Sequence, residues 1–332
     1  MHRNWSFALA AATSLSALMS FGPASAEGLN VVASIKPVHS LVAGVMGDTG
    51  APHLLVSGAD SPHTYSMRPS DAEALSKADV VFWVGEELET FLERPIDNLG
   101  TNARAVSLID APGMTLLDFR DDDDHEHASG HDAEHEDEHG NEEAEEHHAD
   151  DDEHADRHSG LDPHVWLDPA NARAMVSEVV AVLSQADSAN ADTYRRNGED
   201  VAARLKALEA ETQAALMPYQ DIPYFTFHES FGYFDNRFGL DSHGAISISP
   251  ERQPGAQRLK EIRSELAEHN RVCVFSEPQF PPKLVDIVVE GTAARTGTLD
   301  PLGAALEPGS ALYFSLIELN RDAFANCFQE TM

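Results

Sequence analysis

Short runs of β-branched and aromatic residues alternate with helix-length segments along most of this chain. Two of these runs, Val80-Val81-Phe82-Trp83-Val84 and Val272-Cys273-Val274-Phe275, are apolar at every position. Such a strand is buried on both faces, which is typical of a parallel sheet with helices on both sides. Strands that alternate with helices therefore indicate an α/β fold built on parallel sheets.

The alternation occurs twice, once in each half of the chain. The first half is predicted to contain strands at 30–35, 54–56, 80–84 and 105–108, and helices at 37–46, 71–77, before residue 105 and at 170–185. The second half is predicted to contain strands at 224–227, 245–248 and 272–275, and helices at 231–238, 255–269, 282–295 and 310–328. We therefore expect two lobes, each a mostly parallel β-sheet flanked by helices, with a ligand cleft between the lobes.

A single long helix is predicted to join the two lobes. Residues 190–216 contain no proline and one glycine, and they are rich in Ala, Glu, Arg and Leu. A helix of this length spans about 40 Å at about 1.5 Å per residue, which suits a connection between lobes. We therefore place an N-terminal lobe at 27–188, a linker helix at 189–217 and a C-terminal lobe at 218–332.

Residues 1–26 have the features of a secretory signal. Arg3 provides a positive start, residues 5–21 are mostly apolar or small, and Ala24-Ser25-Ala26 matches the small-x-small cleavage pattern. The apolar run is short and rich in Ala and Ser, unlike a membrane span, and no later segment offers one. We expect cleavage after Ala26, export to the periplasm and no insertion into the membrane.

The segment from Asp121 to His158 has an extreme composition. It contains 19 acidic residues and nine histidines, with no Val, Ile, Leu or Phe. It cannot bury enough apolar surface to offset its ordering entropy, so we expect a disordered insertion in the N-terminal lobe. Most charge runs are solvated linkers, but carboxylates beside imidazoles favour metal contact. The candidate accessory metal ligands are His125, His127, His131, His135, His139, His147, His148, His154 and His158.

The net charge of the chain is −35, and it stays acidic outside this insertion. A strongly acidic protein repels phosphate backbones, so nucleic acid is not expected as a partner. The balance suits a cationic ligand, and it equally suits simple solubility.

The two cysteines, Cys273 and Cys327, lie far apart in the sequence. Export to an oxidising compartment and an even count favour a structural disulfide over two free, buried thiols. Neither cysteine has a second cysteine at metal-ligand spacing, which excludes a thiolate zinc finger.

Three histidines stand where side chains point into the cleft of a doubly wound fold. His63 and His164 lie in loops rich in turn residues, and His228 ends the apolar run Tyr224–Phe227. Three neutral imidazoles form a strong ligand set for a divalent transition metal such as zinc. No i, i+4 pair fixes their geometry locally, so spacing alone leaves ordinary loop or core roles open.

Seven motifs along the mature chain resemble those of periplasmic zinc-binding proteins of the ZnuA type, in the metal-specific cluster of ABC-transporter solute-binding proteins. In chain order they are 32–37 (VASIKP), 63–71 (HTYSMRPSD), 162–169 (DPHVWLDP), 227–234 (FHESFGYF), 254–256 (PGA), 276–280 (SEPQF) and 297–303 (GTLDPLG). The resemblance covers nearly the whole mature chain and includes a His- and acid-rich insertion of the kind seen here.

The resemblance implies that His63, His164 and His228 are zinc ligands. Relatives of the manganese type carry Glu at the position of His228, so histidine there favours zinc. Asp300 matches the fourth-ligand position of the wider cluster, whereas some zinc members use water or a Glu just before the first histidine. Pro62 occupies that preceding position here. We therefore expect Asp300 or water as the fourth ligand and favour Asp300, because a closed shell holds cargo without a reactive water.

Two acidic residues and four further histidines have less defined roles. Glu229 and Glu277 can orient ligand imidazoles by accepting their distal N–H, or can be ordinary loop acids. Structural or surface roles are expected for His39, His53, His243 and His269.

The resemblance implies a carrier that binds Zn²⁺ without chemical turnover and delivers it to an inner-membrane ABC permease. We expect a monomer, with the insertion as an accessory low-affinity arm that acquires or senses zinc. One alternative is a periplasmic metal buffer or chaperone acting mainly through the insertion. A zinc hydrolase is another, but it needs an open metal position and a placed general base. The chain has no nucleophile-elbow motif, and its one HExxH pattern, at 135–139, lies in the acidic insertion, where no helix is expected to hold it.

Overall fold

The computed structural model describes residues 28–100, 102–119, 160–247, 254–269 and 271–331. The predicted signal (1–26) and the predicted accessory insertion (121–158) lie outside the described residues.

The first lobe is built on a four-stranded parallel sheet of order β2-β1-β3-β4. Its strands are β1 (Val31–Ala33), β2 (His53–Leu54), β3 (Val80–Trp83) and β4 (Arg104–Ser107). Helices α1 (Lys36–Met46), α2 (Pro69–Ser76) and α3 (Thr90–Leu99) follow β1, β2 and β3. Every residue of β1 and β3 is buried, as expected for central strands covered on both faces.

The second lobe repeats this architecture with the parallel order β6-β5-β7-β8. Its strands are β5 (Tyr224–His228), β6 (Ser242–Ser247), β7 (Cys273–Ser276) and β8 (Arg295–Thr298). Helices α6 (Gly232–Phe238), α7 (Ala256–Glu268) and α8 (Lys283–Val289) lie between them. The two sheets and their helices confirm the predicted fold class.

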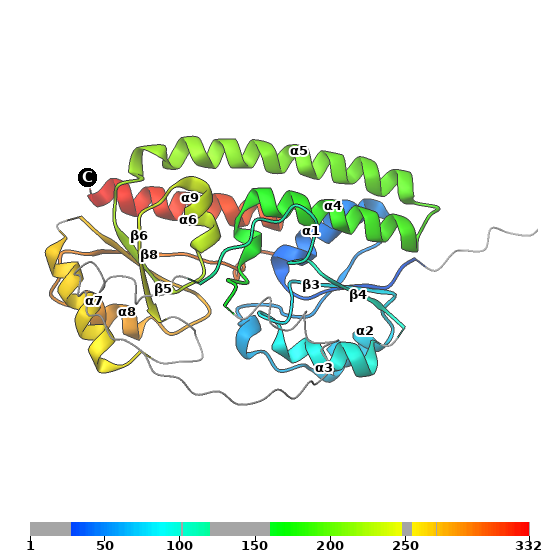
Figure 1. Cartoon of the computed structure of the whole chain (residues 1–332), viewed down its shortest axis with the longest axis horizontal. Helices are drawn as coiled ribbons and strands as arrows, with labels where there is room; N and C mark the ends of the chain where they lie inside the picture. The colour runs from blue at the N-terminus through cyan, green and yellow to red at the C-terminus, as the bar shows by residue number, and fades with distance from the viewer. Residues whose placement is uncertain (1–27, 101, 120–159, 248–253, 270, 332) are drawn as a thin grey trace, which may run out of the picture.

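A layer of long helices spans both lobes. Helix α5 (Ala191–Leu216) runs along one side of the molecule, above both sheets in Figure 1. It packs against α1 and α4 (Pro169–Ala186) of the first lobe and against α9 (Leu312–Thr331), which also contacts β7 and β8. Because these helices share one hydrophobic core, the lobes are held by extended packing rather than by a thin hinge.

The structure corrects one predicted element. The helix predicted at 282–295 ends at Val289 as α8, and residues 295–298 form the edge strand β8 instead. Gly291 has a φ of 77°, which a right-handed helix cannot accommodate. A Cβ on Gly297 would lie 2.6 Å from the Phe275 ring, so glycine lets β8 approach β7.

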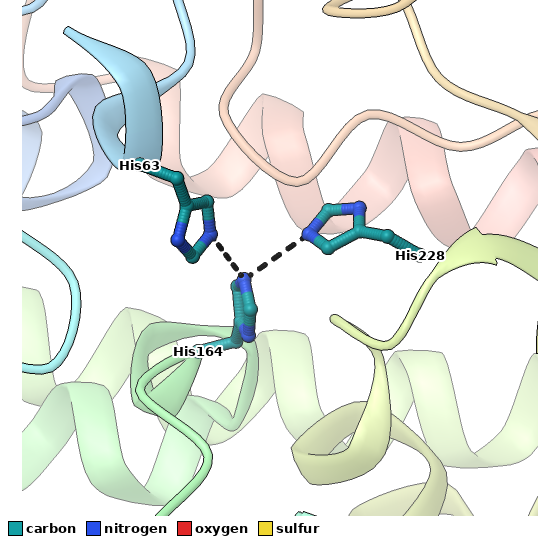
Figure 2. Close-up of side chains that lie close together, drawn as sticks. All are labelled: His63, His164 and His228. Carbon is teal, nitrogen blue, oxygen red and sulfur yellow. Dashed lines mark hydrogen bonds between the residues drawn. The ribbon is translucent and has the colours of Figure 1, made fainter. Parts of the chain in front are cut away.

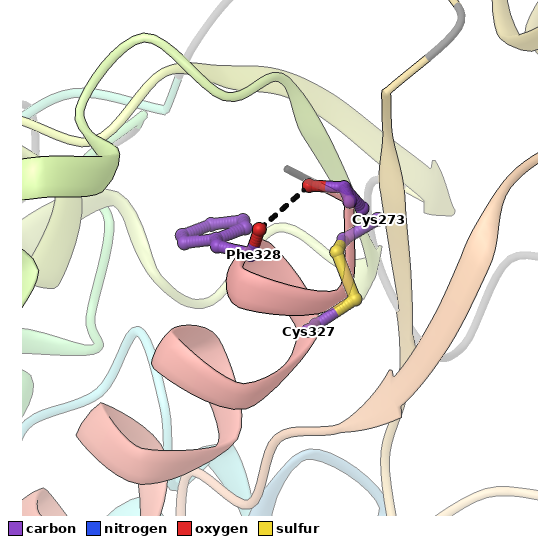
Figure 3. Close-up of a disulfide and its surroundings, with 4 residues drawn as sticks. Cys273, Cys327 and Phe328 are labelled. Atoms are coloured by element: carbon purple, nitrogen blue, oxygen red, sulfur yellow. Dashed lines mark hydrogen bonds between the residues drawn. A yellow bond between two sulfur atoms is a disulfide. The ribbon is translucent and has the colours of Figure 1, made fainter.

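The predicted disulfide is confirmed. Cys273 in β7 is bonded to Cys327 in α9, with Cα atoms 6.3 Å apart (Figure 3). Beside the bond, the ring of Phe328 packs near Tyr224 and Phe275. The disulfide therefore fastens the last helix to a central strand of the second lobe.

None of the described helices is both long enough and apolar enough to span a membrane.

Candidate metal centre

Three histidines from distant parts of the chain converge where the lobes meet. His63 lies in a 3₁₀ turn (Pro62–Thr64) after β2, His164 precedes the 3₁₀ turn Val165–Leu167, and His228 is the last residue of β5. The Nε2 atom of His164 lies 3.3 Å from Nε2 of His63 and 3.3 Å from Nε2 of His228 (Figure 2). The structure therefore brings together all three histidines singled out in the sequence.

The spacing of these nitrogens matches a tetrahedral metal shell. Zinc binds imidazole nitrogen at about 2.0–2.1 Å, so two tetrahedral nitrogen ligands are separated by about 3.3 Å. The two nitrogen separations at His164 have this value. Two edges of the nitrogen triangle therefore have the length of a tetrahedral shell, and the third is at most 4.8 Å.

Buried carboxylates set the tautomers of two of these histidines. Oδ1 of Asp162 lies 2.7 Å from Nδ1 of His164, and Oε1 of Glu277 lies 2.7 Å from Nδ1 of His228. A carboxylate in this position accepts a proton from Nδ1, so each neutral ring presents a lone pair at Nε2. These two Nε2 atoms therefore face each other as acceptors, and a cation between them resolves their repulsion.

The electrostatics of the site favour neutral imidazoles. Burial, with repulsion from the other two histidines, lowers the pKa of His63 to about 2. Burial and the neighbouring His228 hold the pKa of His164 well below its ordinary value. Both rings are therefore unprotonated at neutral pH and ready to bind a metal ion.

Long-range contacts hold the His164 loop in place. The indole Nε1 of Trp166 donates to the carbonyl of Pro301 at 2.8 Å, and the Tyr313 hydroxyl donates to the carbonyl of Trp166 at 2.6 Å. Arg237 makes two hydrogen bonds of 2.7 Å to the Asp168 carboxylate, which also caps helix α4 through the amide of Ala170. Residues of the second lobe and of α9 therefore hold the loop of the first lobe that carries His164.

The same loop lies beside the base of the acidic insertion. Phe119 donates its amide to the carbonyl of Gly160, and Asp162 donates its amide to the carbonyl of Leu117, each at 2.8 Å. Asp118 and Leu161 form an isolated antiparallel bridge there. Asp162, next to this bridge, also binds the His164 ring, so the described residues that flank the insertion lie beside one of the three histidines.

A very small cavity adjoins the three imidazoles. Its free volume is about 10 Å³, which is close to the space of one water molecule. Oε2 of Glu277 and Oε1 of Gln279 are buried without a hydrogen-bond partner among the described residues, and both residues line this cavity. The free space beside the imidazoles is therefore that of a single small particle, such as an ion or a water.

The structure does not bring Asp300 into the histidine group, whose ligand atoms all lie within 4.8 Å of one another. Its Oδ1 accepts hydrogen bonds from the amides of Leu302 and Gly303 and from Nε2 of Gln279. Its Oδ2 accepts the amide of Ala304 at 2.6 Å. The carboxylate is thus held by four donors in a loop behind the cavity.

The predicted orienting acids differ in their contacts. Oε1 of Glu277 contacts Nδ1 of the His228 ring and accepts a hydrogen bond from the backbone amide of His228. Glu229 instead lines a second, acidic hollow with Asp162 and Asp235. Sequence reasoning missed Asp162, although an Asp two residues before a histidine can bind both the amide and the ring of that histidine, as it does here.

The buried histidines predict a stability that depends on pH. Below pH 6.5 the unfolded chain binds protons that His63 and His164 do not bind when folded, so the metal-free protein loses stability as the pH falls. At pH 5 each such histidine lowers the unfolding free energy by about 2 kcal/mol. Urea unfolding of the metal-free protein at pH 7.5 and 5.0 measures this loss.

The matched variants are His63→Ala and His53→Ala, because His53 is an exposed residue on β2. The decrease between the two pH values should be smaller in His63→Ala and unchanged in His53→Ala. Equal decreases in both variants would contradict the assignment of the effect to the buried ring.

Comparisons with known proteins show the family to which this chain belongs. Residues 31–327 match the model of the family ZnuA, described as the periplasmic component A of the zinc-uptake complex. The high-affinity zinc uptake system protein ZnuA of Brucella suis is 45% identical over 310 residues, which cover 92% of this chain and 93% of that protein. The corresponding protein of Yersinia pestis is 34% identical over 330 residues, with 99% and 100% covered.

Solved structures share the fold. A ZnuA deletion mutant with zinc bound superposes with a TM-score of 0.71 at 24% identity, covering 91% of this chain and 98% of that one. A manganese complex of the solute-binding protein FpvC from Pseudomonas aeruginosa has a TM-score of 0.72 at 22% identity, covering 92% and 100%.

Proposed function

Because this chain belongs to the ZnuA family of periplasmic zinc-uptake components, we propose that it captures one Zn²⁺ between its lobes and delivers it to an ABC-type zinc permease. The ligands in this proposal are His63, His164 and His228. The observation that carries it is that Nε2 of His164 lies 3.3 Å from Nε2 of both His63 and His228, with Nδ1 of His164 and His228 held by carboxylates.

The donor set favours zinc as the cargo. Imidazole nitrogen suits zinc and later transition metals, whereas manganese and magnesium prefer sets dominated by oxygen. Asp162 and Glu277 stand behind two of the rings, so two negative charges offset the charge of a divalent ion in a buried site. Three neutral rings alone would leave that charge uncompensated.

For the fourth position, the contacts of Asp300 favour water over the carboxylate that the sequence favoured. Moving Asp300 to the ion would break hydrogen bonds from up to four donors. A water in the small cavity has two protons to donate, and Glu277 and Gln279 each offer a buried oxygen without a partner there.

Asp300→Asn distinguishes these alternatives, because asparagine keeps one acceptor oxygen for the loop. If water completes the shell, zinc affinity changes by less than the roughly 10–100-fold expected for loss of an important metal-site contact. A competition titration with a zinc-selective chelator measures the affinity, and Asp48→Asn is the matched control, because Asp48 is exposed and lies outside the site. A loss beyond about 100-fold in Asp300→Asn alone would identify the carboxylate as a ligand.

We further propose that the insertion is an accessory arm that collects zinc weakly beside the cleft. The described residues that flank it, Asp118 and Leu161, are bridged next to Asp162, and the insertion carries nine histidines. The family is described as periplasmic, which supports a periplasmic location. A carrier that passes zinc to a permease binds and releases the ion without catalysis. The cavity of about 10 Å³ also argues against a hydrolase, since a substrate must reach the metal.

Deletion of residues 121–158 tests the division between cleft and arm. Weak zinc binding should disappear, while one tight zinc per chain remains, because no proposed cleft ligand lies in the deleted segment. Isothermal titration of the intact and shortened proteins measures both classes of site. Loss of the tight site with the deletion would instead support the metal-buffer alternative.

A further inference from the structure

A second group of metal-binding side chains lies on the second lobe. It consists of His243 near the start of β6, Glu265 in the last turn of α7, and His269, the residue that ends α7. One ligand atom from each of these residues lies within 4.8 Å of the others. Glu265 lies in the last turn of α7 and His269 caps that helix four residues later, so both stand at the same end of α7.

Two acidic side chains lie beside the ring of His243. Its Nδ1 lies 2.8 Å from Oε1 of Glu265, and its Nε2 lies 3.5 Å from Oδ2 of Asp241. The ring of His269 stands edge-on to that of His243, with centroids 5.0 Å apart. Two imidazoles and two carboxylates therefore surround one location.

An ion pair alone does not account for this arrangement. A neutral His243 ring has a lone pair on one nitrogen, yet a carboxylate oxygen lies near each of its two nitrogens. Protonation of His243 satisfies both carboxylates but leaves no role for the imidazole of His269, which is repelled if it is also charged. A divalent cation on the Nδ1 side of His243 takes lone pairs from His243, Glu265 and His269, and leaves the Nε2–H of His243 to donate to Asp241.

This group is separate from the cleft. In the sheet, Ser242 pairs with Tyr224, whereas Ser247 pairs with His228. His243 therefore lies four residues upstream of the position level with His228, or about 13 Å away at 3.3 Å per residue. The side chains of His243 and Glu265 are 26% and 39% exposed, so an ion can enter from solvent.

We propose that His243, Glu265 and His269 bind a second divalent transition-metal ion, with Asp241 holding the other ring nitrogen of His243. Two imidazole nitrogens and one carboxylate oxygen suit Zn²⁺. A tetrahedral zinc shell separates ligand atoms by about 3.3 Å, so the group contracts modestly on binding. The ion would fasten the end of α7 to the edge strand β6. Because the donors are partly exposed and must move, this site is weaker than the cleft.

The first experiment locates the ion directly. Crystals of the exported chain, grown with excess ZnCl₂, are measured on both sides of the zinc absorption edge. An anomalous peak bonded to nitrogens of both His243 and His269, in addition to the cleft peak, supports the proposal. A filled cleft with no peak at this group overturns it, as does an ion held there by a neighbouring molecule in the crystal.

The second experiment tests binding in solution, and the insertion is present in every variant. His269→Ala should bind one zinc fewer per chain than the parent in an equilibrium dialysis titration. His53→Ala, which removes an exposed histidine outside the group, should bind as many as the parent. Equal stoichiometry in all three proteins overturns the proposal. The tight cleft site should persist in His269→Ala, so the outcome is independent of the function proposed above.

Discussion

Replacing His164 with alanine is expected to lower zinc affinity by well over about 100-fold, the upper range for loss of a group that only orients a ligand. Nε2 of His164 is the atom that lies 3.3 Å from both other imidazole nitrogens. Its loss removes one nitrogen ligand and leaves His63 and His228 as the proposed protein ligands. It also leaves Asp162 as a buried carboxylate whose ring partner is gone. Competition against a zinc-selective chelator measures the affinity.

A graded series separates coordination from general damage to the loop. Asp162→Asn keeps the imidazole and weakens its orientation, so the affinity should fall by about 10–100-fold. His39→Ala removes a buried histidine that contacts the carbonyl of Pro52, away from the cleft, and should leave zinc affinity unchanged. His164→Ala with an affinity no weaker than that of Asp162→Asn would contradict the proposed ligand role.

Removing the disulfide is expected to cost about 4 kcal/mol of unfolding free energy, from the loop-entropy relation for a separation of this size. The bond links residues 54 apart and joins the last helix to a central strand. The double variant Cys273→Ala/Cys327→Ala avoids burying new hydroxyl groups at two buried positions. Urea unfolding of this variant and of the oxidised parent measures the difference.

The zinc site provides an internal control for that measurement. Cys273 is the first residue of β7, whereas Glu277 follows the other end of that strand and contacts His228. The folded variant should therefore bind zinc like the parent. The dithiothreitol-reduced parent should match the variant in stability. A loss below about 1 kcal/mol in both would contradict the structural role assigned to the bond.

The sequence was most informative where a local pattern has a single structural meaning. The apolar runs at Val80–Trp83 and Cys273–Phe275 became central parallel strands, because only burial on both faces suits them. The three histidines were found because each follows a strand or lies in a turn-rich loop, where a parallel sheet presents its ligands. The disulfide followed from the cysteine count and the predicted export.

Edge elements were less predictable. Strand β8 was not predicted, and its first residue was assigned to the helix before it, because Arg295-Thr296-Gly297-Thr298 has no apolar alternation. Pairing with β7 and the close approach at Gly297 make it a strand. Its structure is therefore decided by a neighbour more than 15 residues away, as tertiary contacts override weak local preference.

The partners of the ligands were also hidden in the sequence. From the sequence, Glu229 and Glu277 were equally good candidates to orient a histidine ring. Because β5 packs beside β7, it is Glu277 that contacts the His228 ring. The link between His243 and the pair Glu265 and His269 joins a strand to a helix. Sequence spacing reveals the helical half of that group and not the strand residue.

The sequence by itself determined the alternation of strands and helices, the long helix, the cysteine pair and the identity of the three cleft histidines. These depend on periodicity, residue type and motif, which are properties of short segments. Only the tertiary structure decided that Nε2 of His164 lies 3.3 Å from the other two Nε2 atoms, that Asp162 and Glu277 hold two of the rings, and that Asp300 is held by loop amides. Those features depend on distances between residues far apart in the chain, which are set by the packing of two sheets against one shared helical layer.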